Sequence, residues 1–126
     1  MRYFTLVASI LSLFTRSTHA SVTCNFNRLE EPGVYRTDCT MAWVDDNNAW
    51  RANCGWGTFD WAEGSGSQHG KITTVNFREE ETLYFSFHTI QDNGESRWFA
   101  SEVGPGETCT MNLNPRTIVE RVTADF

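Results

Sequence analysis

The stretch CTMAWVDDNNAWRANCGWGTFDW, from Cys39 to Trp61, decides the fold of this chain. It holds two of the four cysteines and four of the five tryptophans. At its centre lies Asp45-Asp46-Asn47-Asn48, a cluster of residues that tolerate left-handed backbone and hydrogen-bond their own turn. Apolar residues flank this cluster on both sides. The stretch therefore predicts a β-hairpin that turns about Asp46 and Asn47.

This hairpin sets Cys39 opposite Cys54 and Trp43 opposite Trp50. Side chains an even number of residues apart along a strand point to the same face of a sheet. A single register thus predicts a cross-strand disulfide and a cross-strand aromatic pair on one face. Because the disulfide shares that face, we expect Trp43 and Trp50 to lie in the core.

The first twenty residues resemble a secretory signal peptide. Arg2 provides a positive start, Tyr3 to Phe14 is an apolar run, and Ala20 offers a small residue before the expected cleavage point. We therefore expect residues 1–20 to be a signal peptide and residues 21–126 to be one secreted domain. All four cysteines lie in that domain, which favours an oxidising, extracellular destination and two disulfides.

The expected mature chain is acidic. Two of the ten basic residues, and none of the 16 acidic ones, fall in the first twenty positions, which leaves a net charge of −8. An acidic surface of this size argues against nucleic acid and anionic membrane as partners. No later segment is apolar for long enough to span a bilayer.

The remaining segments read as short strands. Strands are expected at 22–29, 34–39, 71–77, 82–90 and 109–113, with a last strand or a short helical turn at 118–122. Gly55 and Gly57 bracket Trp56 and predict a bulge or tight bend. These features predict an all-β fold, a small disulfide-stapled antiparallel β-barrel or sandwich.

Asp92-Asn93-Gly94-Glu95 gives a second hairpin signal, because Asn-Gly suits a two-residue type I′ turn. Pairing about this turn sets Phe87 across from Ala100 and Thr89 across from Trp98. The expected apolar face then consists of Leu83, Phe85, Phe87, Trp98 and Ala100.

The four cysteines allow three pairings. The first hairpin favours Cys39–Cys54, which leaves Cys24 to bond Cys109. The pairing of Cys24 with Cys39 stays open, since it closes a loop of the same length and also spans a turn.

Catalytic and metal-binding signals are weak. His69 lies in a polar Gly- and Ser-rich loop and His88 on an expected strand, with Glu102 and Arg78 as nearby candidates for a general acid–base set. Neither histidine belongs to a motif. Asp45 and Asp46 offer a weak calcium site, but the turn already explains them. We expect no cofactor and no metal.

The tryptophans are the better binding candidates. Exposed indoles stack on sugar rings and anchor protein interfaces. Trp56, between two glycines, and Trp61, beside the flexible loop, are the two that we expect nearer the surface.

One part of the chain resembles a known family. Cys39 is followed by fourteen residues that include Trp50, then by Cys54, Gly55, Thr58 and Phe59. This pattern is similar to that of the family of the major Alternaria allergen, a group of fungal secreted β-barrel proteins. The resemblance covers about Asp38 to Leu113. It implies a compact β-barrel, the Cys39–Cys54 bridge, a fungal origin and no enzymatic activity.

The family's members are described as allergens, elicitors of plant defence and virulence-associated proteins that bind host proteins. This sequence departs from the family in having only Cys109 late in the chain, so that Cys24 must serve as its partner. It is also shorter before the hairpin, where it lacks an obvious cysteine for the family's disulfide-linked dimer. A monomer is therefore expected.

Three hypotheses for function follow. The first is a non-enzymatic, secreted, effector-like fungal protein that binds a host extracellular protein. The second is a carbohydrate-binding module that uses Trp56 or Trp61. The third is a small secreted hydrolase that uses His69 or His88.

Overall fold

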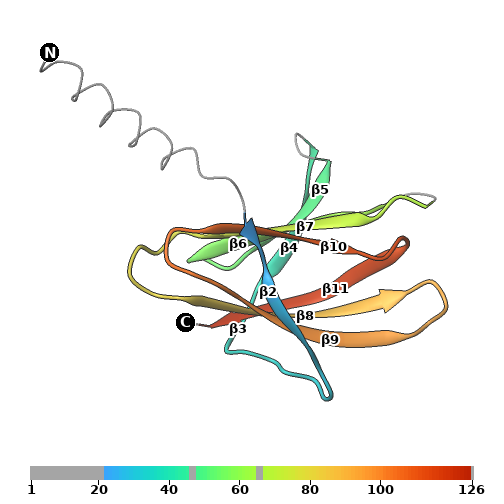
Figure 1. Ribbon diagram of the computed structural model, residues 1–126, viewed down its shortest axis with the longest axis horizontal. Coiled ribbons are helices and arrows are strands. Elements are labelled where there is room, and N and C mark those ends of the chain that lie inside the picture. The colour runs from blue at the N-terminus through green and yellow to red at the C-terminus, as the bar shows by residue number, and fades with distance from the viewer. Residues whose placement is uncertain (1–21, 46–47, 65–66, 126) are drawn as a thin grey trace, which may run out of the picture.

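The computed structural model describes residues 22–45, 48–64 and 67–125, and these form eleven β-strands (Figure 1). The strands are β1 (Val22–Thr23), β2 (Asn25–Leu29), β3 (Thr37–Asp38), β4 (Thr40–Val44), β5 (Ala49–Asn53), β6 (Gly57–Ala62), β7 (Gly70–Asn76), β8 (Leu83–Gln91), β9 (Ser96–Val103), β10 (Thr108–Leu113) and β11 (Thr117–Asp125). No α-helix occurs in these ranges, so the predicted all-β class is confirmed. The predicted signal peptide and the turn residues Asp46 and Asn47 lie outside the described residues.

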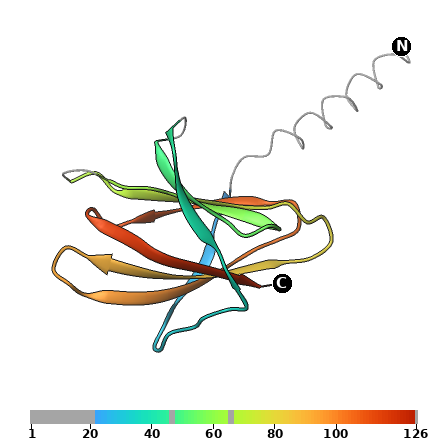
Figure 2. The same cartoon turned by 180° about the vertical axis from the view of Figure 1, so that it is seen from behind.

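The strands form two stacked sheets. One has six strands in the order β1-β10-β7-β6-β5-β4, and the other has five in the order β2-β9-β8-β11-β3. Figures 1 and 2 show the two sheets as separate layers from opposite sides. All pairings are antiparallel except that of β1 with β10. The described strands therefore form a sandwich, and the closed barrel that the resemblance implied is not present among them.

Aromatic side chains fill the space between the sheets. Phe59 on β6 packs against Phe85 and Phe87 on β8, with ring centroids 5.7 and 5.0 Å apart. All three side chains are fully buried, as are Ile72 and Val122. Burying each aromatic side chain stabilises the fold by about 1.5–3 kcal/mol. Because side chains alternate between the faces of a strand, Ile72 on β7 and Phe85 and Phe87 on β8 point inward.

Two of the five crossings of the chain between the sheets lie at cysteines. Cys24 separates β1 in the first sheet from β2 in the second, and Cys39 separates β3 in the second sheet from β4 in the first. Residues 22–29 were predicted as one strand, but the crossing at Cys24 divides them. The bonds Cys24–Cys109 and Cys39–Cys54 confirm the favoured pairing. Each crossing residue is thus bonded to a strand, or strand end, of the six-stranded sheet.

The first hairpin has the predicted register. Trp43 pairs with Trp50 and Thr40 with Asn53, and the disulfide Cys39–Cys54 continues the same register. After Cys54 the chain reverses tightly through Gly55, which has a φ of 85°, and continues antiparallel as β6. The expected bend between the two glycines is therefore a turn between neighbouring strands.

The second hairpin differs from the prediction by one residue. Phe87 pairs with Phe99 and His88 with Trp98, because Asp92-Asn93-Gly94 forms a three-residue loop closed by Gln91 and Glu95. Only Gly94 in this loop has a positive φ, 86°, whereas a type I′ turn needs two such residues. A shift of one residue moves every side chain of a strand to the other face. The predicted placement of Trp98 on the apolar face with Phe87 was therefore wrong.

A buried asparagine organises one end of the sandwich. The Asn76 side-chain amide donates to the backbone carbonyls of Glu81, Val103 and Gly104 at 2.8–3.1 Å, and its Oδ1 accepts from the Arg78 backbone N–H. Its side chain thus ties the turn after β7 to the end of β9. Replacing it would remove this partner from one buried and three part-buried backbone groups.

We therefore expect Asn76→Ala to lower the free energy of unfolding by about 2–4 kcal/mol. The matched control is Asn53→Ala, which removes one exposed bond to the Gly55 N–H and should cost less than about 1 kcal/mol. Urea unfolding followed by tryptophan fluorescence measures both. Equal losses for the two variants would contradict this role of Asn76.

Candidate functional site

An exposed tryptophan pair lies on the β4–β5 hairpin. Trp43 is 47% exposed and Trp50 is 37% exposed, although both were expected in the core. Their indole rings meet edge to face, with centroids 5.4 Å apart and planes at 71°. The prediction of a cross-strand pair is confirmed, and the prediction that the pair is buried was wrong.

The exposure follows from where the hairpin ends. By strand alternation, Trp50 lies on the same face as Ala52 and Cys54, and these two side chains are buried. Figures 1 and 2 show that one end of the paired strands β4 and β5 projects away from the sandwich. The two tryptophans lie near that end, where their indoles are only partly covered. Their position next to the predicted turn is the feature of the sequence from which this exposure could have been predicted.

The other two tryptophans of the stretch are less accessible. Trp61 on β6 pairs in register with Trp50 but is only 5% exposed and belongs to the core. Trp56 is half-buried and packs against the core, and its backbone carbonyl accepts a hydrogen bond from the Phe77 N–H. The expectation that Trp61 lies near the surface was wrong, so its indole is not available to a sugar or protein partner.

An ion pair on neighbouring strands fixes the hairpin. Arg51 on β5 donates from Nε and Nη2 to the two carboxylate oxygens of Asp60 on β6, at 2.7 and 2.8 Å. The hydrogen bonds and the charge of Asp60 raise the pKa of Arg51 above its usual value. A two-point contact of this kind fixes the orientation of the guanidinium as well as its distance. The strand that presents Trp50 is thereby held on its neighbour.

The histidines do not form the suggested catalytic set. His88 stacks on Trp98 with ring centroids 4.7 Å apart, and its Nδ1 lies 3.1 Å from the Glu120 carboxylate. Glu102 instead accepts from Asn25, and Arg78 pairs with Glu81. His69 is exposed in the loop before β7. The Glu120 contact was not foreseen, because Glu120 lies at a register shift within β11, between Val119 and Arg121.

Two further kinds of site are absent from the described residues. In ranges 22–45, 48–64 and 67–125, no three His, Cys, Asp or Glu side chains cluster closely enough to hold a metal ion. Within the same ranges, no helix is long and apolar enough to cross a membrane. The exposed tryptophan pair is the candidate surface for recognition, because its two indoles are adjacent and half-exposed.

Comparison with known proteins gives no relative. No family model, no curated protein and no solved structure matches this chain. The resemblance to the Alternaria allergen family therefore stays a prediction.

The different surroundings of the tryptophans predict different effects on stability. Trp43→Ala should change the free energy of unfolding by less than about 1 kcal/mol, because its indole is half-exposed. Trp61→Ala should cost about 3–5 kcal/mol, because it leaves a cavity in the core. Urea unfolding of both variants makes the comparison. A larger loss for Trp43→Ala than for Trp61→Ala would contradict this assignment of the two side chains.

Proposed function

We propose that this chain is a secreted, non-enzymatic protein that acts by binding another protein outside the cell. The single observation that carries the proposal is the exposed Trp43–Trp50 pair on the projecting hairpin. Tryptophan is enriched among the residues that dominate protein–protein binding energy. Two adjacent half-exposed indoles have no core role that explains their position.

The ring geometry favours a protein partner over a sugar. In the edge-to-face arrangement, the edge of one indole points at the face of the other, so the pair forms a ridge and not a flat platform. A sugar stacks on a flat aromatic face, whereas a ridge fits a pocket on a folded protein. The glycan hypothesis is further weakened because it relied on Trp56 and Trp61, which are half-buried and buried.

The backbone beside the pair supports the same interpretation. β4 lies at the end of the six-stranded sheet order, so its outer edge carries no partner strand among the described residues. An edge strand offers backbone donors and acceptors to a strand of another protein. Trp43 lies on this edge strand, and Trp50 lies on the strand beside it. Side-chain and backbone contacts could therefore act together.

Several features of the chain bear on its compartment and its partner. Two disulfides and no free cysteine among the described residues indicate an oxidising environment. The signal-peptide pattern of residues 1–20 extends this to secretion. From the resemblance to the Alternaria allergen family, we further infer that the chain is a fungal effector and that its partner is a host extracellular protein. The net charge of −8 on residues 21–126, with eight basic and 16 acidic residues, favours a partner with a basic binding surface.

The test begins with capture of proteins from host extracellular fluid, followed by purification of the captured protein. Its dissociation constant is then measured for wild type, Trp43→Ala, Trp50→Ala and a matched control, Trp98→Ala. Trp98 stacks on His88, away from the hairpin. We expect each hairpin variant to weaken binding by about 30-fold or more, which corresponds to a hot-spot residue, and the control to change it by less than about threefold.

Two results would contradict the proposal. Equal binding by all four proteins would exclude the tryptophan ridge as the contact surface. Sedimentation with insoluble chitin or glucan that is lost in Trp43→Ala and Trp50→Ala would replace the protein partner with a glycan.

A further inference from the structure

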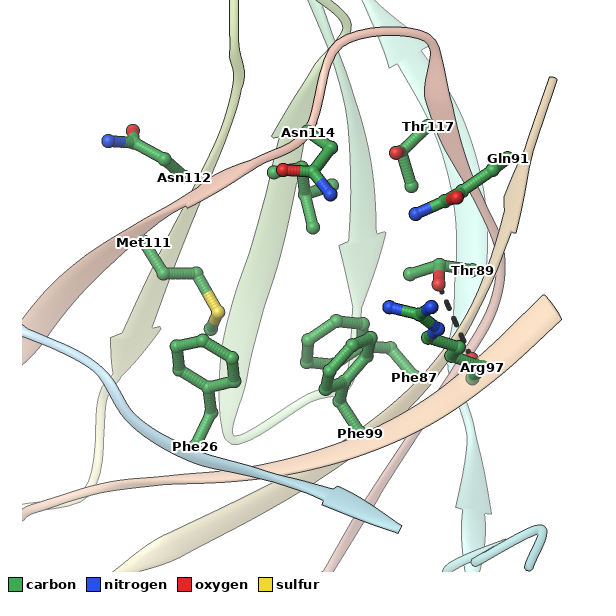
Figure 3. A pocket seen from close by; sticks show the side chains of 11 residues that line it. Phe26, Phe87, Thr89, Gln91, Arg97, Phe99, Met111, Asn112, Asn114 and Thr117 are labelled. Carbon is green, nitrogen blue, oxygen red and sulfur yellow. Dashed lines mark hydrogen bonds between the residues drawn. The ribbon is translucent and has the colours of Figure 1, made fainter. Parts of the chain in front are cut away.

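We propose that a cleft between the two sheets is a second, separate binding site, and that it takes a small aromatic carboxylate. The cleft lies where β2, β8 and β9 of one sheet face β10 of the other, and it encloses about 180 Å³ (Figure 3). Its side chains divide into an apolar half and a polar half.

Aromatic rings and a thioether form the apolar half. Phe99 stacks on Phe87 with ring centroids 5.4 Å apart, and Phe26 meets Phe99 edge to face at 5.8 Å. Figure 3 shows Met111 facing Phe26 across this half. Phe26, on the edge strand β2, is 41% exposed, so the apolar half reaches the surface. A flat ring can enter there and pack between aromatic and sulfur-containing side chains.

The polar half contains two buried atoms without a hydrogen-bond partner. The Nε of Arg97 is buried and unpaired, and so is the Oγ1 of Thr117, whose residue is only 4% exposed. Both residues line the cleft. Buried polar atoms are almost always paired with protein, water or a ligand. Two residues of this cleft therefore each hold an unused hydrogen-bonding atom.

The charge of this half selects an anion. Arg97 is the only charged residue among the described residues that line the cleft. Its Nη2 donates to Glu95 at 3.0 Å, and Glu95 is half-exposed at the end of the strand. The buried Nε remains to donate to a carboxylate oxygen, while the Thr117 hydroxyl serves as a second donor. Hydrogen bonds between a guanidinium and a carboxylate are among the strongest in proteins.

The size of the cleft limits the ligand to about one ring. An apolar cavity of about 150 Å³ in another protein takes up benzene. At about 180 Å³, this cleft has room for one aromatic ring and a carboxylate on a short arm. Benzoate, phenylacetate and trans-cinnamate represent this class.

The position of Arg97 argues that the cleft is specific. Strand alternation places Arg97 on the same face of β9 as Phe99, which stacks on the buried Phe87 between the sheets. Inward positions of a sandwich are normally apolar, whereas Arg97 is a partly exposed arginine that lines the cleft, with its Nη2 paired to Glu95 and its Nε unpaired. The three-residue loop at Asp92–Gly94 sets the β8–β9 register and so turns Arg97 inward.

The test is a titration of the folded protein with trans-cinnamate, followed by isothermal calorimetry and by ¹H–¹⁵N NMR. Cinnamyl alcohol keeps the ring and removes the charge, and hexanoate keeps the charge and removes the ring. The variants are Arg97→Gln, Thr117→Val and the matched control Arg121→Gln, which removes an exposed arginine paired with Asp38. NMR spectra of each free variant establish that it is folded.

We expect cinnamate to bind to the wild type and to shift the amide signals of Phe26, Phe99 and Met111. Binding should be at least about tenfold tighter than that of cinnamyl alcohol or hexanoate. Arg97→Gln should weaken it about tenfold or more and Thr117→Val several-fold, while Arg121→Gln leaves it unchanged. The absence of binding, equal affinity for the alcohol, or full affinity in folded Arg97→Gln would each overturn the proposal and leave water as the occupant.

Discussion

The fold depends on two disulfides placed where the chain changes sheets. At Cys24 the chain leaves the six-stranded sheet, and at Cys39 it returns; each crossing residue is bonded back to that sheet. Each bridge fixes one crossing covalently to the six-stranded sheet, so that the crossing does not depend on packing alone. On the loop-closure model, the shorter bridge contributes about 3 kcal/mol and the longer one nearly 5 kcal/mol. Between the crossings, the chain supplies both edge strands, β2 and β3, of the five-stranded sheet.

The two proposed sites arise where the sheets leave each other uncovered. The β4–β5 hairpin extends past the sandwich, so that two indoles on its inward face reach solvent. On the other side, β2 and β9 stand away from β10 and leave a cleft with an inward-facing arginine. Each crossing cysteine directly precedes the edge strand at one site: Cys39 precedes β4, and Cys24 precedes β2. The bridges thus hold the edges that carry the exposed Trp43 and Phe26.

Much of the fold could be predicted from the sequence, but side-chain exposure could not. The DDNN cluster and strand alternation correctly placed Cys39 opposite Cys54 and Trp43 opposite Trp50. The same argument put both tryptophans in the core, because alternation gives the face of a strand and not how far the other sheet extends. Asn93-Gly94 suggested a two-residue turn, yet Gly94 alone takes the left-handed conformation. The resulting shift of one residue in the register placed Trp98 on the face opposite to the predicted one. It also turned Arg97 inward, which the sequence argument did not predict.

Peptide mapping of the non-reduced protein tests the central claim most directly. Trypsin cleaves after Arg36, Arg51 and Arg97, so that each cysteine falls in a separate peptide. If each crossing is anchored to the six-stranded sheet, the map will show the two linked pairs Cys24–Cys109 and Cys39–Cys54. The pairs Cys24–Cys39 and Cys54–Cys109 would contradict it, because they would join the two crossings to each other instead of anchoring each one to the six-stranded sheet.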